Sequence, residues 1–395
     1  MPQNRRTVLT TIVVLVVLLG VAFLFARLAG RAGLPPAAAF VLVGLVAGGV
    51  LPHALHISLT PPVLALFLPA LIFEAAWDVD ASALRRAAPA IVVLAVPGAL
   101  LTAAAIAGSA AFGAGMVLPG ALALGAILSA TDPVAVLALF RTQGVPLGLL
   151  TIVEGESIAN DAVAVVLLGA VVAFPHSGNE GALLTLIARS VYVSGAGIAI
   201  GLLIGVLATP ILRRFGRSWV GIVTTVVVAY GAYGVASSLG GSGIFASAAA
   251  GVALPAVPLD ITEQQTVGRF WDGTALVANG IVFLLVGLSL QFERIFHEPL
   301  LIGVTVLAVG ASRAALAYVM VPLGHRRSER SGWRHAIALA GLRGGLSLAL
   351  ALGLPETVPA RAQIIDAVFA VVFLTIVVQG WALAPLLRRV QLRGA

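Results

Sequence analysis

The sequence predicts an all-α polytopic membrane protein with about thirteen transmembrane helices, and three observations lead to this fold class. Of the 395 residues, 60% are hydrophobic and only 10% are charged, whereas a soluble domain carries about 25% charged residues. The mean hydropathy is +1.09, and several apolar stretches reach the ~20 residues that span a bilayer. The 44 glycines suit close packing of helices in lipid.

The lengths of the apolar runs place the spans along the chain. A polar connection over residues 257–272 separates the ninth span from the tenth and has room for a surface helix. No segment is left over for a soluble domain, so residues 1–395 form a single transmembrane unit. The expected spans are residues 7–26, 37–52, 62–77, 88–113, 119–140, 147–174, 183–208, 219–239, 242–256, 273–291, 300–323, 336–354 and 362–387.

Two of these spans contain helix breakers in mid-membrane. The fifth has Thr131-Asp132-Pro133, where proline removes a backbone donor, and the twelfth has Gly341-Leu342-Arg343-Gly344-Gly345, where glycines loosen the helix. If spans 1–6 and 8–13 are two halves, these breaks stand at equivalent positions. Paired interrupted helices are typical of transporters with a midplane site. We therefore expect two inverted six-helix repeats whose discontinuous helices, the fifth and the twelfth, cross.

The basic residues set the expected orientation. All 23 are arginine, and they are scattered through short loops as topology signals and not gathered for nucleic acid. In the thirteen-span topology 16 lie on one side and 5 on the other, which predicts a multi-pass protein of the cell (inner or plasma) membrane with a cytoplasmic C-terminus and an external N-terminus. Arg5 and Arg6 disagree, and with residues 8–25 they also fit a cleaved signal peptide, although no clean cleavage motif follows.

Several chemistries are excluded by composition. The chain has no Cys and no Lys, so it contains no disulfide, no thiol nucleophile, no Schiff-base lysine and no phosphate-binding loop of the GxxxxGK[ST] type. Energy coupling must come from an ion gradient or a partner. We expect no cofactor.

At least four of the 16 acidic residues stand inside apolar runs, among them Asp132, Glu154, Glu156 and Asp161. A carboxylate at membrane depth is costly and marks a path for ions or protons by default. Spacing in the sixth span places Glu154, Ser157 and Asp161 on one helix face.

The break in the fifth span supplies the oxygen atoms that a hard cation needs. Ser129, Thr131 and Asp132 lie where an interrupted helix frees backbone carbonyls, and carbonyls with a carboxylate form a cation cage. Asp161, with the Ser157 hydroxyl one turn away, completes the set of candidate ligands.

Glu156 and Asn160, four residues apart, lie on an adjacent face of the sixth span. A buried carboxylate that points away from the site needs a buried cation. We expect Arg343 of the twelfth span to be this partner, with Arg313 as the second choice.

Glu74 in the third span stands one turn before Trp77 and Asp78, which are interface residues. It is either a residue of the membrane rim or a third acidic group that faces the site.

Three segments together carry a family resemblance. Ala130-Thr-Asp-Pro-Val-Ala-Val136, Glu154-Gly-Glu-Ser-Ile-Ala-Asn-Asp161 and Gly341-Leu-Arg-Gly-Gly-Leu-Ser347 resemble the signature segments of the cation/proton antiporter superfamily. The likeness is to the branch of prokaryotic NhaP exchangers and animal sodium/proton exchangers, and it covers nearly the whole chain. The long cytoplasmic tail of the animal members is missing.

The resemblance implies both an architecture and a site. The architecture is a homodimer with a core domain, approximately residues 62–174 and 273–354, and a dimerisation or panel domain, approximately 7–52 and 183–256, with 362–387 packing alongside. The implied site has Asp161 as the carboxylate that binds cation or proton, Asn160 beside it, Asp132, Glu74, the Thr131 carbonyl and Ser157 around the cation, and Glu156 paired with Arg343.

The leading hypothesis is a secondary antiporter that exchanges Na⁺, or Li⁺ or K⁺, for H⁺, and not an enzyme. One alternative is an intramembrane aspartyl protease that uses Asp132 and Asp161, because paired carboxylates activate water, although no Gly-x-Gly-Asp sequence occurs. A passive cation channel is the other alternative. A single titrating carboxylate and the absence of lysine predict electroneutral 1:1 exchange, since arginine does not release its proton in proteins.

Overall fold

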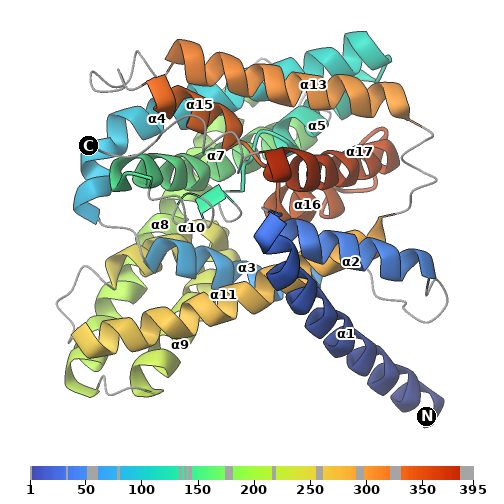
Figure 1. The fold of residues 1–395 in the computed structure, drawn as a ribbon. Helices are drawn as coiled ribbons and strands as arrows, with labels where there is room; N and C mark the ends of the chain where they lie inside the picture. Colours follow the sequence, from blue (N-terminus) through green and yellow to red (C-terminus); the bar gives the residue numbers. More distant parts are fainter. Residues whose placement is uncertain are drawn as a thin grey trace. The chain divides into compact units, whose positions relative to one another are not determined.

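All regular elements in the described part of the chain are helical (Figure 1). They group into two compact units. Unit 1 comprises Met1–Pro61, Pro89–Leu168 and Gly280–Ala395, and unit 2 comprises Pro62–Ala88 and Gly169–Asn279. The structure, a computed structural model, describes residues 2–32, 34–50, 61–77, 81–132, 136–137, 140, 145–173, 181–215, 219–254, 261–290, 298–320 and 331–382.

Length and composition make many of these helices able to cross a bilayer. Five shorter apolar helices of 10–17 residues accompany them. Within the described ranges, the prediction of an all-helical membrane protein is therefore confirmed. The seven helices that are long and apolar enough to span are Arg85–Gly113, Leu147–Val172, Val191–Arg214, Trp219–Ser238, Gln264–Ser289, Pro299–Val319 and Arg361–Ala382.

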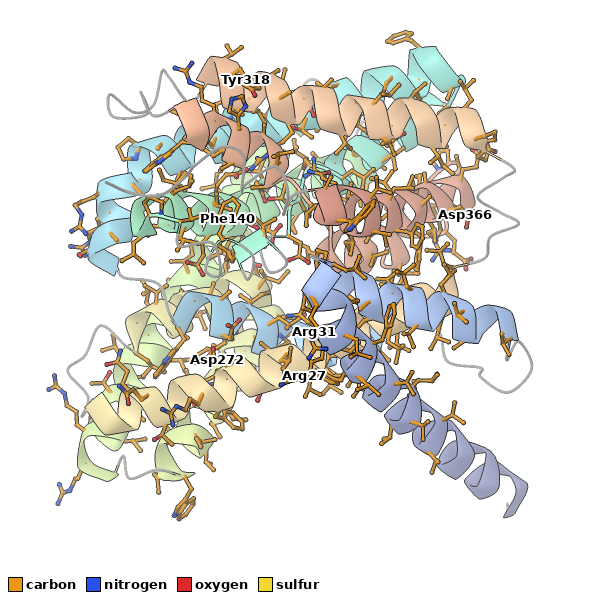
Figure 2. All side chains as sticks on the ribbon, in the orientation of Figure 1. Arg27, Arg31, Phe140, Asp272, Tyr318 and Asp366 are labelled. Carbon is orange, nitrogen blue, oxygen red and sulfur yellow. The ribbon has the colours of Figure 1, made fainter. Side chains whose placement is uncertain are left out.

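Large apolar side chains cover the outside of these helices. On α1 (Pro2–Ala29) Val16 and Val17 are exposed, and on α13 (Pro299–Ala315) Leu307 is 73% exposed. Such surfaces would be unfavourable in water but suit contact with acyl chains. The basic residues Arg27 and Arg31 lie together at the C-terminal end of α1 (Figure 2).

Unit 2 is built on tightly packed helices with small residues between them. Gly201 of α8 lies against the Ala246 carbonyl of α10, and a side chain at position 201 would clash with that oxygen. Close backbone approach of this kind stabilises helix pairs in lipid. The hydrophobic core of the unit contains Phe73 against Trp271, with ring centroids 4.7 Å apart. The helices are α3 (Pro61–Trp77), α8 (Gly181–Phe215), α9 (Trp219–Ser238), α10 (Gly243–Ala253) and the first part of α11 (Ile261–Ser289).

The described part of the polar connection, residues 261–272, is helical but is continuous with the next span, because α11 runs without interruption from Ile261 to Ser289. Its first turns are amphipathic. Val267 and Trp271 are buried, and the Trp271 indole N–H donates to Thr225 Oγ1 at 3.0 Å, whereas Asp272 on the opposite side is exposed. Burial of one face keeps the polar stretch helical.

Unit 1 contains both interrupted helices. Three π-helical turns also occur, at Ser109–Gly113, Leu316–Met320 and Thr375–Gln379. Helix α17 packs against α16, α13 and α5 within this unit (Figure 1). The remaining helices of the unit are α2 (Pro36–Val50), α4 (Ala81–Gly108, from Pro89), α5 (Leu118–Ile127), α7 (Leu147–Ala173), α15 (Ser331–Leu339), α16 (Gly345–Leu352) and α17 (Arg361–Leu374).

Both predicted interruptions are confirmed. Helix α5 stops at Ile127, residues 128–132 are not helical, and helical residues return at 136, 137 and 140. In the same way α15 stops at Leu339 and α16 starts at Gly345, with residues 340–344 between them outside any helix.

Candidate functional site

The first break, residues 128–132, and the second break, residues 340–344, lie against each other inside unit 1 and share hydrogen bonds. The Asp132 N–H donates to the Leu342 carbonyl at 2.8 Å, and the Ser347 hydroxyl donates to the Ile127 carbonyl at 3.1 Å. Backbone groups that lose their helical partners in a membrane must find others. Here each break supplies partners for the other.

Arg343 of the second break binds the first break through its side chain. Its Nη1 donates to the carbonyls of Ala130 at 2.8 Å and Ser129 at 3.2 Å, and the residue is only 1% exposed. These carbonyls follow the last turn of α5, where the negative end of the helix dipole favours a cation. Arg343 thus neutralises the C-terminal end of the first half-helix.

Asp132 belongs to the first break, and its carboxylate lies at the end of the second break. Its carboxylate lies so close to Gly344, the residue before α16, that any side chain at position 344 would collide with Asp132 Oδ2. The N-terminal end of a helix favours an anion. The Asp132 carboxylate therefore lies at the N-terminal end of α16, and the Arg343 guanidinium lies at the C-terminal end of α5. Pro133, the predicted helix breaker, lies outside the described residues.

Thr131 is the residue that joins the first break to α7. The Ser157 hydroxyl donates to the Thr131 carbonyl at 2.6 Å, and Asn160 Nδ2 donates to Thr131 Oγ1 at 2.7 Å. The Thr131 N–H completes the contact by donating to Asn160 Oδ1 at 3.3 Å. All three residues are buried. The structure therefore brings together Thr131, Ser157 and Asn160.

The partner predicted for Glu156 is wrong. Arg313 of α13, and not Arg343, forms the ion pair, with Nη1 to Oε1 at 2.6 Å and Nη2 to Oε2 at 2.7 Å. Arg313 Nε also donates to the Ile337 carbonyl at 2.9 Å. Arg343 instead donates from Nη1 to the carbonyls of the first break, and its Nε has no hydrogen-bond partner among the described residues. Arg313, the second choice from the sequence, has the parallel two-bond geometry that makes such pairs strong.

Asp161 is arranged differently from every other acidic residue of this region. Its Oδ1 is buried and has no hydrogen-bond partner among the described residues. A carboxylate oxygen that is buried without a donor favours binding of a proton or a cation. No cluster of three or more His, Cys, Asp or Glu side chains suited to a metal occurs in the described ranges.

Glu74 lies on α3 of unit 2 and is half-buried. Its part in the cation site stays a prediction.

Sequence reasoning missed two polar residues of the last helix that contact the second break. Thr375 Oγ1 accepts from the Arg343 N–H at 3.3 Å, and Gln379 Nε2 donates to the Leu339 carbonyl at 3.0 Å. The available signal was a Thr and a Gln four residues apart in an otherwise apolar run, because polar residues in membrane spans usually have a function.

The chain as a whole is similar to proteins of known function. A family model described as "Sodium/hydrogen exchanger, transmembrane" matches residues 13–389. The Na(+)/H(+) antiporter ApNhaP of Aphanothece halophytica is 34% identical over 391 residues, which are 97% of this chain and 75% of that protein. The antiporter NhaS2 of Synechocystis sp. is 34% identical over 400 residues, covering 98% and 72%.

The fold also has a counterpart among solved structures. The sodium proton antiporter MjNhaP1 from Methanocaldococcus jannaschii superposes with a TM-score of 0.77, covering 96% of this chain and 99% of that one. At 20% sequence identity this likeness concerns the fold alone.

Proposed function

The chain belongs to the sodium/hydrogen exchanger family, and we propose that it exchanges Na⁺ for H⁺ through competition of the two ions for Asp161. It is a secondary transporter and not an enzyme. The observation that carries the mechanism is the buried Oδ1 of Asp161, which has no donor among the described residues. One carboxylate that binds either ion, but not both, couples the two flows.

The cation is held by oxygen atoms near the first break. We assign Asp161, Asp132, the Thr131 carbonyl and the Ser157 hydroxyl to this role. The Thr131 carbonyl already accepts from Ser157, but a carbonyl oxygen has two lone pairs and can also face a cation. Oxygen ligands of this kind suit Na⁺ and Li⁺, and K⁺ is the third candidate.

The exchange is electroneutral in this proposal. Asn160 stands beside Asp161 and makes hydrogen bonds to Thr131 and Glu156, so only one carboxylate of this pair titrates. Glu156 is held by Arg313, and the chain has no lysine. One proton replaced by one monovalent cation moves no net charge.

The architecture in this proposal has thirteen spans in two inverted repeats, arranged as a core and a panel domain in a homodimer. The contact between the two breaks supports the repeat. The excess of arginine on one side supports a cytoplasmic C-terminus and an external N-terminus in the cell membrane. Access alternates between the two sides of the bilayer.

The test is proton flux in liposomes that contain the purified protein, with an internal pH dye and Na⁺, Li⁺ or K⁺ added separately. We expect each accepted cation to drive protons the other way, at a rate that an imposed membrane potential does not change. Cation current without proton movement would identify a channel and overturn the proposal. Proton flux that follows the voltage would overturn only the 1:1 stoichiometry.

A further inference from the structure

The π-helical end of the last helix lies directly on the second break. Helix α17 ends at Leu374 and continues as the π-helical turn Thr375–Gln379. Such turns are rare, and they occur often at functional sites. This turn also packs against α2, with Gly380 close to Pro35. The turn therefore contacts α2 on one side, and its residues Thr375 and Gln379 contact the second break on the other.

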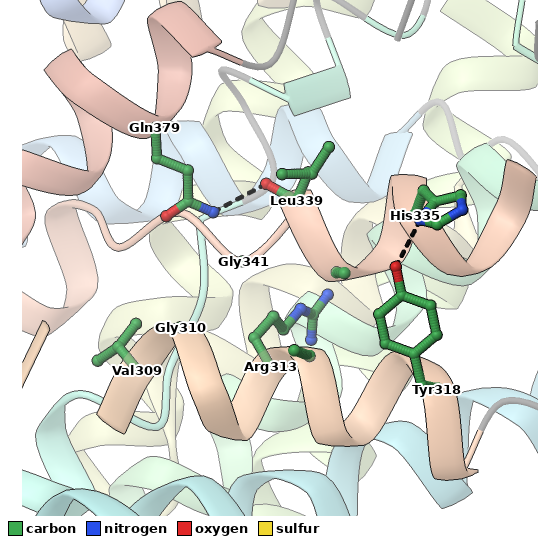
Figure 3. Close-up of a pocket in the computed structure, with 10 residues that line it drawn as sticks. Val309, Gly310, Arg313, Tyr318, His335, Leu339, Gly341 and Gln379 are labelled. Carbon is green, nitrogen blue, oxygen red and sulfur yellow. Dashed lines mark hydrogen bonds between the residues drawn. The ribbon is translucent and has the colours of Figure 1, made fainter. Parts of the chain in front are cut away.

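Thr375 and Gln379 hold the two ends of the unwound segment. The Thr375 hydroxyl donates to its own helix at Val372 and accepts the Arg343 N–H at 3.3 Å, while Gln379 Nε2 donates to the Leu339 carbonyl at 3.0 Å (Figure 3). Leu339 is the last residue of α15. Its carbonyl is one of those that a helix end leaves without a partner.

The second break is buried, and Gly341 packs against the Arg313 side chain. A cavity of about 510 Å³ lies beside it, and Leu339, Gly341, Gln379 and Arg313 are among its lining residues (Figure 3). Beside this cavity, the bonds of Thr375 and Gln379 add directional contacts to the packing of residues 340–343.

Three hydrogen bonds connect this segment to the candidate ion site. Leu342 accepts the Asp132 N–H, and the Arg343 side chain holds the carbonyls of Ser129 and Ala130. Thr131 lies between these contacts and is a proposed ligand. A displaced second break therefore displaces the first.

We propose that Thr375 and Gln379 are positioning residues that set the affinity for the transported cation without touching it. They preorganise the oxygen cage by fixing the break that supports it. A proton on Asp161 needs no such cage, because a single oxygen binds it. Loss of either side chain therefore weakens cation binding more than proton binding. This inference rests on the proposed function and concerns the same site.

The experiment measures the apparent KM for Na⁺ and the maximal rate in liposomes at alkaline pH, where protons compete least. We expect Thr375→Val to raise the KM by about three- to tenfold, as the loss of one ordinary hydrogen bond would do, with little change in maximal rate per folded protein. Thr375→Ser keeps the hydroxyl and should stay near the wild-type KM. Gln379→Leu should raise the KM in the same way, and it carries the test alone if Thr375→Val does not fold.

Thr305→Val is the matched control. Thr305 on α13 of the same unit is fully buried, and its hydroxyl has no hydrogen-bond partner among the described residues, so the same substitution removes no contact to the break. Its KM should equal that of the wild type.

Two outcomes overturn the inference: an unchanged KM in both Thr375→Val and Gln379→Leu, or an equal rise in Thr305→Val. If the wild type itself shows no cation-driven proton flux, the proposed function fails, and the two failures are thereby distinguished.

Discussion

Glu156 and Asp161 lie five residues apart on α7, and their surroundings differ completely. Both oxygens of Glu156 accept from Arg313, and Oε1 also accepts from Asn160 at 3.1 Å. Arg313 is itself held by the Ile337 carbonyl. Asp161, in contrast, has a buried Oδ1 with no partner among the described residues. Burial is common to both carboxylates, so it does not identify the one that carries ions.

The two carboxylates differ in whether their oxygen atoms already accept hydrogen bonds from fixed donors. A carboxylate with all its acceptor sites occupied by fixed donors stabilises the fold and has no reason to bind a cation or proton. A carboxylate oxygen without a donor gains from either ion. We therefore expect substitutions at Glu156 to change stability, and substitutions at Asp161 to change transport.

The largest effect should come from Asp161→Asn, which we expect to reduce exchange to background while the protein stays folded. The amide keeps the shape of the side chain but neither releases a proton nor offers a negative charge to Na⁺. The measurement is Na⁺-driven proton flux in liposomes, together with the thermal unfolding midpoint with and without Na⁺. Ligand binding stabilises the wild type, and that Na⁺-dependent shift should vanish in the variant. Wild-type flux in folded Asp161→Asn would refute the assignment.

Glu156→Ala and Arg313→Ala should each destabilise the protein by about 3–5 kcal/mol, because each leaves a buried charge without its partner. The double variant should recover part of this loss. The measurement is the free energy of unfolding in detergent.

The control for that cycle combines Glu156→Ala with Arg343→Ala. These residues serve different partners, so their losses should add. Recovery in this pair, and none in the pair with Arg313, would mean that the ion pair is wrongly assigned.

A smaller effect, about 2 kcal/mol of destabilisation, is expected for Asn160→Asp. The change removes the donations to Thr131 Oγ1 and Glu156 Oε1 and brings a second carboxylate toward Glu156. Asn160→Ala removes the same donations without the new charge and should therefore be the less destabilised of the two. The comparison of the two unfolding midpoints checks this order, and the reverse order would contradict it.

The smallest effect should follow Ser157→Ala, which removes one bond of 2.6 Å to the Thr131 carbonyl. We expect a loss of about 1 kcal/mol in stability and a roughly threefold higher KM for Na⁺, if one weak ligand is worth an ordinary hydrogen bond. Flux as a function of Na⁺ concentration measures the second quantity. An unchanged KM would limit Ser157 to anchoring Thr131.

Some of this site follows from the sequence because local chemistry determines it. Thr131-Asp132-Pro133 and the glycines around Arg343 interrupt helices wherever those helices pack, so both breaks could be predicted. The placement of Ser157 and Asn160 on adjacent faces of the sixth span also follows from helical period. Their contacts with Thr131 appear only in the folded structure.

The rest depends on which helix lies beside which. Two buried arginines were available to Glu156, and nothing in the spacing of Arg313 or Arg343 tells which one reaches it. The sequence indicates that the first break frees backbone carbonyls, but it does not indicate which arginine binds them. The contacts of Thr375 and Gln379 likewise require the packing of α17 on the break.

The bond between Arg343 and the Ser129 carbonyl joins residues 214 positions apart, and this separation has a consequence for biosynthesis. A ribosome that adds 5–20 residues per second needs roughly 10–40 s to make the intervening chain. During that time the first half-helix is already in or near the bilayer, with exposed carbonyls and a carboxylate whose stabilising partners do not yet exist. The nascent chain must therefore wait, shielded by the insertion machinery or by water, until the twelfth segment is translated.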